Sequence, residues 1–201
     1  PELGDDVAAV LFGCISLIAE PCGSVYETLM AREAPRRVMY LDPNIREIFI
    51  ADRQKHLARM RRMIALADIV KLSDEDLAWF AEPGEEHEVI RRWLTLGPKL
   101  IVVTRGADGA DAWTADFHLH VPAIRVAVAD TVGAGDTVNA GILASLSQAG
   151  LLEKEKLVTL SREQVRRAVD LGMRAAAVTV SRPGANPPWD HELRSQQRPG
   201  L

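Results

Sequence analysis

An acidic residue that follows two closely spaced glycines is the feature of this sequence best suited to chemistry. The segment 130–137 reads DTVGAGDT, and an apolar helical stretch follows it. Glycines let a backbone approach a ligand, and the first amides of a helix have no internal partner and carry partial positive charge. Gly133, Ala134 and Gly135 therefore predict an anion hole for a phosphoryl group. Asp136 is placed to accept a proton from a substrate hydroxyl, as phosphoryl transfer requires.

The same four residues also fit a tight turn followed by an acidic helix cap. For an isolated match this simpler interpretation is favoured, so the surrounding sequence has to decide. A P-loop is excluded because the sequence contains no GxxxxGK[ST], and the Rossmann pattern GxGxxG does not occur at this position.

Three further polar or glycine-rich clusters directly follow predicted apolar strands. They are 42–46 after the strand 38–41, 73–76 after 69–72, and 104–109 after 100–103. If these strands are parallel, the clusters share the carboxyl edge of the sheet, where open α/β sheets bind ligands. The sequence therefore predicts the site at that edge.

Strands and helices alternate along most of the chain. We expect buried strands at 10–16, 38–41, 69–72 and 100–104, and two short paired strands at 110–114 and 118–121. Expected helices are one opened by a capping box of Ser24 and Glu27, one capped by Ser73, one opened by Ser161 and Gln164, and others at 53–66, 86–96 and 135–148. The tail from Arg182 is expected to be irregular. This alternation predicts the α/β class, with a mostly parallel sheet covered on both faces.

Composition excludes several classes of partner. The 201 residues carry a net charge of -4 and only 5% aromatic residues, which favours neither a nucleic-acid nor an acidic-membrane partner. The apolar run 7–19 is interrupted, too short for a membrane span and without a basic segment before it, so a buried strand is predicted there. Cys14 and Cys22 do not form a CxxC motif and predict reduced thiols in a cytoplasmic protein.

Taken together and in this order, the motifs resemble those of the ribokinase-like, or PfkB, carbohydrate kinases. Segment 130–137 is similar to the family signature, and Thr104, Gly106 and Gly109 match its nucleotide-binding loop. Segment 175–185 resembles the last helix and the adenine-side loop. The resemblance implies a Rossmann-like, ribokinase-like three-layer sandwich. Residues 1–201 would be the carboxy-terminal two-thirds of one kinase domain, without the amino-terminal part and the lid.

The resemblance also implies roles for single residues. Asp136 would be the general base that deprotonates a primary sugar hydroxyl, with ATP as the phosphoryl donor. Arg46 and Arg105 would clamp phosphates as guanidinium forks do, with solvated surface charge as the alternative.

Two cation sites follow from the resemblance. The family's Asn-x-x-Glu element near Mg²⁺-ATP corresponds here to Ser73 and Asp76, which also fit a helix cap. Many members bind a monovalent cation such as K⁺ beside the anion hole. The matching positions are Asp130 and backbone carbonyls near Val132, Thr179 and Gly184.

The substrate is indicated by shorter segments. Segments 15–21, 42–46 and 104–107 resemble bacterial fructokinases, although DPNxR also occurs in 2-keto-3-deoxygluconate kinases. We therefore expect an ATP-dependent fructokinase, with a 2-keto-3-deoxygluconate or nucleoside kinase as alternatives. A non-catalytic nucleotide-binding module is a third alternative, since the segment with most sugar contacts is missing. The missing lid often mediates dimerisation, which would make the full-length protein a homodimer.

Overall fold

The order of the strands in the sheet follows their order in the chain. The computed structural model describes residues 2–194. Its sheet contains β1 (Ala9–Gly13), β2 (Val38–Asp42), β3 (Ile69–Ser73), β4 (Leu100–Thr104), β5 (Ala110–Trp113) and β6 (His118–Val121). Strands β1 to β4 are parallel, and β5 and β6 add an antiparallel hairpin at one edge.

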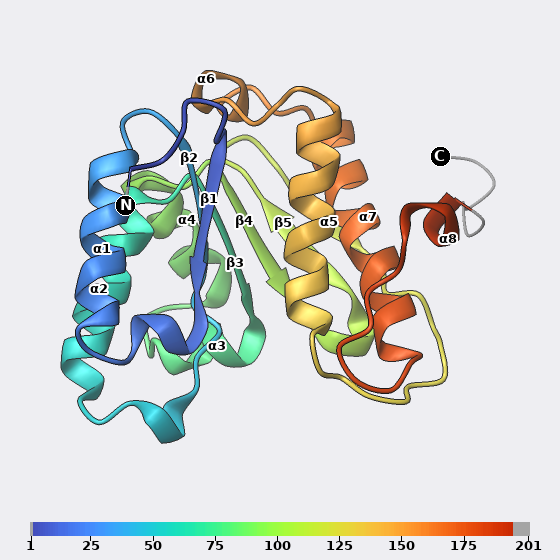
Figure 1. The fold of residues 1–201 in the computed structure, drawn as a ribbon, viewed down its shortest axis with the longest axis horizontal. Helices are drawn as coiled ribbons and strands as arrows, with labels where there is room; N and C mark the ends of the chain where they lie inside the picture. Colours follow the sequence, from blue (N-terminus) through green and yellow to red (C-terminus); the bar gives the residue numbers. More distant parts are fainter. Residues whose placement is uncertain (1, 195–201) are drawn as a thin grey trace.

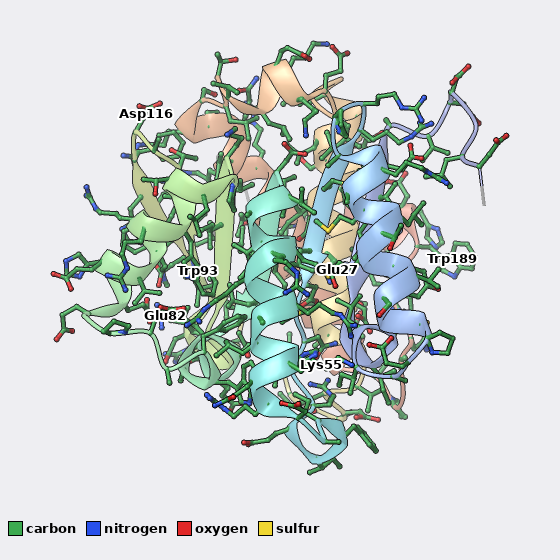
Figure 2. The ribbon with its side chains drawn as sticks, turned by 90° about the vertical axis from the view of Figure 1, so that its left-hand side faces the viewer. Glu27, Lys55, Glu82, Trp93, Asp116 and Trp189 are labelled. Carbon is green, nitrogen blue, oxygen red and sulfur yellow. The ribbon has the colours of Figure 1, made fainter. Side chains whose placement is uncertain are left out.

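Helices cover both faces of this sheet. Helices α1 (Cys22–Glu33), α2 (Arg53–Leu66) and α4 (Glu86–Leu96) connect neighbouring parallel strands. Since such crossovers are right-handed, all three fall on the same face, as Figure 2 shows. Helices α5 (Ala134–Gln148) and α7 (Arg162–Val180) cover the other face (Figure 1). The result is the predicted three-layer α/β sandwich.

Short elements complete the fold. They are the 3₁₀ turns η1 (Cys14–Leu17), η2 (Glu47–Phe49) and η3 (Gly106–Asp108), and the helices α3 (Asp74–Trp79), α6 (Lys154–Leu157) and α8 (Asp190–Arg194). Within the residues described, no helix is both long and apolar enough to span a membrane.

The two faces of the sheet carry separate apolar cores. On β2, Met39 and Leu41 belong to the core under α1, α2 and α4, whereas Val38 and Tyr40 belong to the core under α5 and α7. Such near-continuous burial is typical of parallel strands covered on both faces. Because successive side chains alternate between faces, Asp42, two positions after Tyr40, lies on the face of α5.

The structure corrects the expected first strand. Its extended part ends at Gly13, and Cys14, with φ of 60°, begins η1 instead of continuing a strand to residue 16. Nor is the run 7–19 buried throughout. Among the five residues of β1, only Phe12 is buried. The reason is that β1 is an edge strand of the described sheet, with β2 as its neighbour there.

The capping box predicted at Ser24 is wrong. Helix α1 begins at Cys22, with Pro21 as its N-cap, so Ser24 already lies in the first turn. The Ser24 amide donates to the Glu20 carboxylate at 3.2 Å, and the Ser24 hydroxyl accepts from Arg59.

The other two predicted caps are confirmed, and the tail needs a correction. Ser73 with Asp76 and Ser161 with Gln164 both form reciprocal capping boxes. Residues 190–194 form the short helix α8 where irregular chain was expected, while 195–201 lie outside the described residues.

Candidate active site

The amino end of α5 lies at the carboxyl edge of the parallel strands, low in the view of Figure 1. Gly133 is its N-cap and has φ of 77°, a left-handed conformation that favours glycine. The Ala134 and Thr137 amides donate to Thr131 and Gly133 carbonyls at 3.2 and 2.9 Å. In the described part of the chain, the amides of Gly135 and Asp136 have no acceptor. These two open amides lie where the anion hole was predicted, but the Ala134 amide, which was predicted to belong to it, already donates to Thr131.

A buried ammonium group lies next to this turn. A Cβ atom built on Gly135 would lie 2.9 Å from Lys71 Nζ, and Lys71 is only 4% exposed. Glycine at position 135 therefore lets a full positive charge approach the helix end. Sequence reasoning missed Lys71; the available signal was an ionisable residue within the otherwise apolar strand 69–72.

Lys71 is held by a carboxylate of the neighbouring strand. Its Nζ lies 3.1 Å from Asp42 Oδ2, and both side chains are buried. Burial raises the pKa of the Asp42 carboxyl, while Lys71 and Asn139 act against that rise. Asn139 of α5 donates to Asp42 Oδ2 at 2.6 Å. Among the described residues, the buried Asp42 Oδ1 has no hydrogen-bond partner.

Asp136 is available for proton transfer. The residue is exposed and stands in the first turn of α5. Throughout residues 2–194, no hydrogen bond or ion pair engages its carboxylate. A free carboxylate beside open helix amides and a buried ammonium fits a general base next to a phosphoryl site.

The predicted nucleotide residues lie on the same edge. Ser73 and Thr104 are direct neighbours in the β3–β4 register. The loop after Thr104 closes through a 2.8 Å bond from the Arg105 amide to the Gly109 carbonyl. Gly106 has no neighbouring atom within 4 Å of a Cβ built on it, so this part of the loop is open to a ligand.

The two arginines predicted to clamp phosphates have other partners. Arg105 donates to Glu86 and, at 2.6 Å, to Asp111; Glu86 and then Asp111 raise the pKa of the Arg105 guanidinium. The exposed Arg46 donates to the neighbouring Ile45 carbonyl at 2.9 Å. Their roles as phosphate clamps stay predictions. To bind a phosphate, Arg105 would have to release the carboxylates of Glu86 and Asp111.

Asp76 acts as a cap. Its two carboxylate oxygens accept the amides of Ser73 at 3.1 Å and of Ile45 at 2.8 Å, and so tie the segment after β2 to α3. Its metal-assisting role stays a prediction. The described residues contain no group of three or more His, Cys, Asp or Glu side chains that could hold a metal ion.

Asp130 ties the loop before α5 to the segment that follows α7. It accepts the amides of Val132 at 3.0 Å and Gly184 at 2.9 Å, and these two bonds lower the pKa of its carboxyl. The structure thus brings together Asp130 and Gly184, both predicted at the monovalent-cation site.

A hollow of about 550 Å³ adjoins the first turns of α5. It lies between α5, α7 and the segment that follows α7. Its lining includes Thr137, Ala140, Gly141, Arg174, Pro187 and Pro188.

Comparison with known proteins decides the family. The family model described as pfkB family carbohydrate kinase matches residues 5–192. The chain belongs to the pfkB family. This confirms the resemblance drawn from the motifs, and the matched range of this pfkB chain includes the open amides and the free carboxylate at the start of α5.

Two curated relatives of this pfkB chain are fructokinases. It is 52% identical over 170 residues to the fructokinase of Rhizobium leguminosarum bv. trifolii, covering 85% of this chain and 52% of that one. Fructokinase-1 of Zea mays is 33% identical, with 92% of this chain and 56% of the relative covered. The chain thus spans about half the length of the curated relatives that it matches.

Solved structures confirm the ribokinase-like fold of this pfkB chain. The fructokinase of Vibrio cholerae O395, in its fructose, ADP and calcium ion bound form, superposes with a TM-score of 0.83 at 26% identity, covering 97% of this chain and 62% of that one. The aminoimidazole riboside kinase of Salmonella enterica, complexed with aminoimidazole riboside and an ATP analog, has a TM-score of 0.81 at 26% identity, covering 94% and 62%.

Proposed function

We propose that this chain supplies the phosphate side and the general base of an ATP-dependent fructokinase. The observation that carries the proposal is the geometry at the start of α5. There the unpaired Asp136 carboxylate, the open amides of Gly135 and Asp136, and the buried Lys71 ammonium occupy one helix turn and its immediate neighbourhood.

In this proposal Asp136 accepts the proton of a primary sugar hydroxyl. The hydroxyl oxygen forms a bond to the γ-phosphorus of ATP, the bond from that phosphorus to ADP breaks, and the proton stays on Asp136 until it leaves to solvent. The open amides and the Lys71 charge stabilise the negative charge on the transferred group, since preorganised donors act strongly in such sites.

The nucleotide would occupy the edge next to this turn. Thr104, Gly106 and Gly109 would contact ATP, with Ser73 beside Thr104. The hollow along α5 and α7 lies within the usual size range of ligand pockets, about 300–1,000 Å³, and is proposed for the nucleoside end.

The proposed ions are Mg²⁺ with ATP and K⁺ beside the anion hole. Asp76 would assist Mg²⁺, which would neutralise phosphate charge; each of its oxygens accepts one amide and retains a second lone pair. Asp130 would hold K⁺ together with backbone carbonyls near Gly184. Support comes from Vibrio cholerae fructokinase structures described with calcium ion and with potassium ion.

Fructose is the proposed acceptor because the 52% identical relative is a fructokinase. A nucleoside kinase is the second candidate, favoured by the likeness to the riboside kinase of Salmonella enterica. Initial rates over a panel of fructose, other hexoses, 2-keto-3-deoxygluconate and ribosides, with ATP consumption as the readout, separate these acceptors.

Asp136→Asn tests the general base. Loss of a general base costs about 100- to 10,000-fold in turnover, so we expect a loss in that range with nucleotide binding retained. Asp116→Asn, an exposed aspartate at the β5–β6 turn, is the matched control and should keep full turnover. Near-normal turnover of Asp136→Asn would contradict the role of Asp136 as general base. Nucleotide binding without turnover in the unmodified protein would instead favour a non-catalytic binding module.

The remaining expectations are part of the same proposal. Three predictions remain. Residues 1–201 would be the carboxy-terminal two-thirds of one kinase domain, the full-length protein would be a homodimer, and neither nucleic acid nor a membrane would be a partner. A cytoplasmic location is supported by the unpaired thiols Cys14 and Cys22, which suit a reducing compartment.

A further inference from the structure

Four buried polar side chains form a continuous chain beneath the start of α5. Tyr40 of β2 donates its hydroxyl to Asn139 Oδ1 at 3.0 Å, and Asn139 Nδ2 lies 2.6 Å from Asp42 Oδ2. The same Asp42 oxygen lies 3.1 Å from Lys71 Nζ. The chain ends at the ammonium next to Gly135. Tyr40, Asp42, Lys71 and Asn139 are called the buried polar chain below.

The chemistry of these groups fixes the direction of every bond. A lysine ammonium only donates, so Asp42 Oδ2 accepts from Lys71. The ammonium counters the effect of burial and favours the ionised carboxylate, which only accepts, so Asn139 Nδ2 donates to the same oxygen. Asn139 Oδ1 then faces Tyr40, whose hydroxyl donates to it. Burial raises the pKa of the Tyr40 hydroxyl, so this group remains a protonated donor. The amide of Asn139 therefore has one orientation.

The surroundings give no packing reason for an asparagine here. Asn139 is 2% exposed, and its neighbours along α5, Val138 and Ile142, belong to the apolar core with Val38 and Ile69. A buried amide is costly unless it is hydrogen-bonded, and an aliphatic side chain would pack against such neighbours without that cost. The position of Asn139, three residues after Asp136, instead connects the catalytic turn of α5 to β2 and β3.

We propose that Asn139, oriented by Tyr40, is a positioning residue that acts through Asp42 to hold the Lys71 ammonium beneath the phosphoryl-binding turn. This inference rests on the proposed function, because it concerns the charge that the anion hole presents to the terminal phosphates of ATP. Without Asn139, Asp42 loses its second donor and its side chain is free to turn, and the ammonium loses its fixed place below Gly135.

The test compares the dissociation constants of ATP and AMP, measured by calorimetry at fixed salt and magnesium. AMP is the matched control ligand because it lacks the terminal phosphates that would reach the turn. Hydrogen bonds to charged groups are strong. We therefore expect Lys71→Met to raise the ATP dissociation constant about 10- to 100-fold, and Asn139→Leu to raise it about five- to tenfold. Both variants should change the AMP dissociation constant less than about twofold, because residues that share no contacts with a ligand usually act independently of it.

The double variant Lys71→Met/Asn139→Leu separates positioning from simple packing. If Asn139 acts through Lys71, Asn139→Leu should weaken ATP no further once the ammonium is absent, since coupled residues are not additive. Ile142→Val, a buried change on the same helix outside the buried polar chain, should leave the ATP-to-AMP ratio unchanged. Tyr40→Phe removes one hydroxyl and serves as the milder variant if Asn139→Leu does not fold; about a two- to fivefold loss for ATP alone is expected.

The outcomes distinguish this inference from the proposed function. An unmodified protein that does not bind ATP more tightly than AMP would overturn both. A strong effect of Lys71→Met, together with an unchanged ATP-to-AMP ratio in Asn139→Leu and Tyr40→Phe, would overturn the inference alone. Additive losses of ATP affinity in the double variant would also overturn the inference, because Asn139 would then act through packing and not through Lys71.

Discussion

Lys71 Nζ lies so close to the backbone of Gly135 that a Cβ atom at this position would be 2.9 Å away. The ammonium comes from the third residue of β3, and the glycine from the first turn of α5, 64 positions later in the chain. This proximity combines two sources of positive charge, a side chain and a helix amino end, at one place. Several expectations depend on it.

Gly135→Ala should impair function more than stability. The added methyl has to displace Lys71 Nζ, which Asp42 holds in a buried position, so we expect ATP affinity to fall about tenfold, as for a lost charged hydrogen bond. Gly172→Ala is the control, on the facing helix α7 and outside the lining of the hollow. Its Cβ would lie 2.9 Å from the Val138 carbonyl oxygen of α5, so it should destabilise the fold by about 1–3 kcal/mol. Calorimetry and urea unfolding measure the two effects; equal effects of both variants on ATP affinity would contradict this view.

Arg105→Met tests whether Arg105 clamps phosphates or organises its loop. Because its guanidinium already bonds Glu86 and Asp111, we expect the melting temperature to fall by about 2–4 °C. ATP affinity should fall less than about threefold, since such a partly exposed network contributes modestly. A loss of ATP affinity as large as that of Lys71→Met would instead assign Arg105 to the phosphates. Arg91→Met, an exposed arginine on α4, is the control for removal of surface charge.

The Asp130 carboxylate should stabilise the loop before α5 in a pH-dependent manner. The amides of Val132 and Gly184 lower its pKa from the ordinary value of 3.8. A lowered carboxyl pKa gives stability that is fully present above pH 3.8 and is lost as the pH falls through the folded-state value. Asp130→Asn should therefore lower the melting temperature at pH 7, and the difference from the unmodified protein should shrink toward pH 3.

The control for this pH series is Asp116→Asn, at an exposed aspartate of the β5–β6 turn. It should leave the melting temperature nearly unchanged across the series. If the difference in melting temperature between Asp130→Asn and the unmodified protein stays constant from pH 7 to pH 3, the carboxylate charge does not contribute to stability.

The sequence predicted most of the elements because their signals are local. The 3.6-residue apolar period of α2, the capping boxes of α3 and α7, and the short apolar strands each depend on residues close together in the chain. Errors arose where distant residues decide. At Ser24, for example, the hydroxyl accepts from Arg59, 35 positions later in the chain, instead of capping a helix.

For the candidate site, the sequence by itself determined the open amides at the start of α5 and the carboxylate beside them. Gly133–Asp136 are consecutive, and a glycine turn before a helix makes open amides by local geometry alone. Only the tertiary structure decided that Arg105 bonds Glu86 and Asp111 and that the buried polar chain lies beneath Gly135. Its members come from β2, β3 and α5, and their contacts depend on strand register and on how α5 packs on the sheet. Such long-range packing leaves no periodic trace in the sequence: Asp42 stands in a predicted polar cluster, but Lys71 and Asn139 are single polar positions within apolar segments.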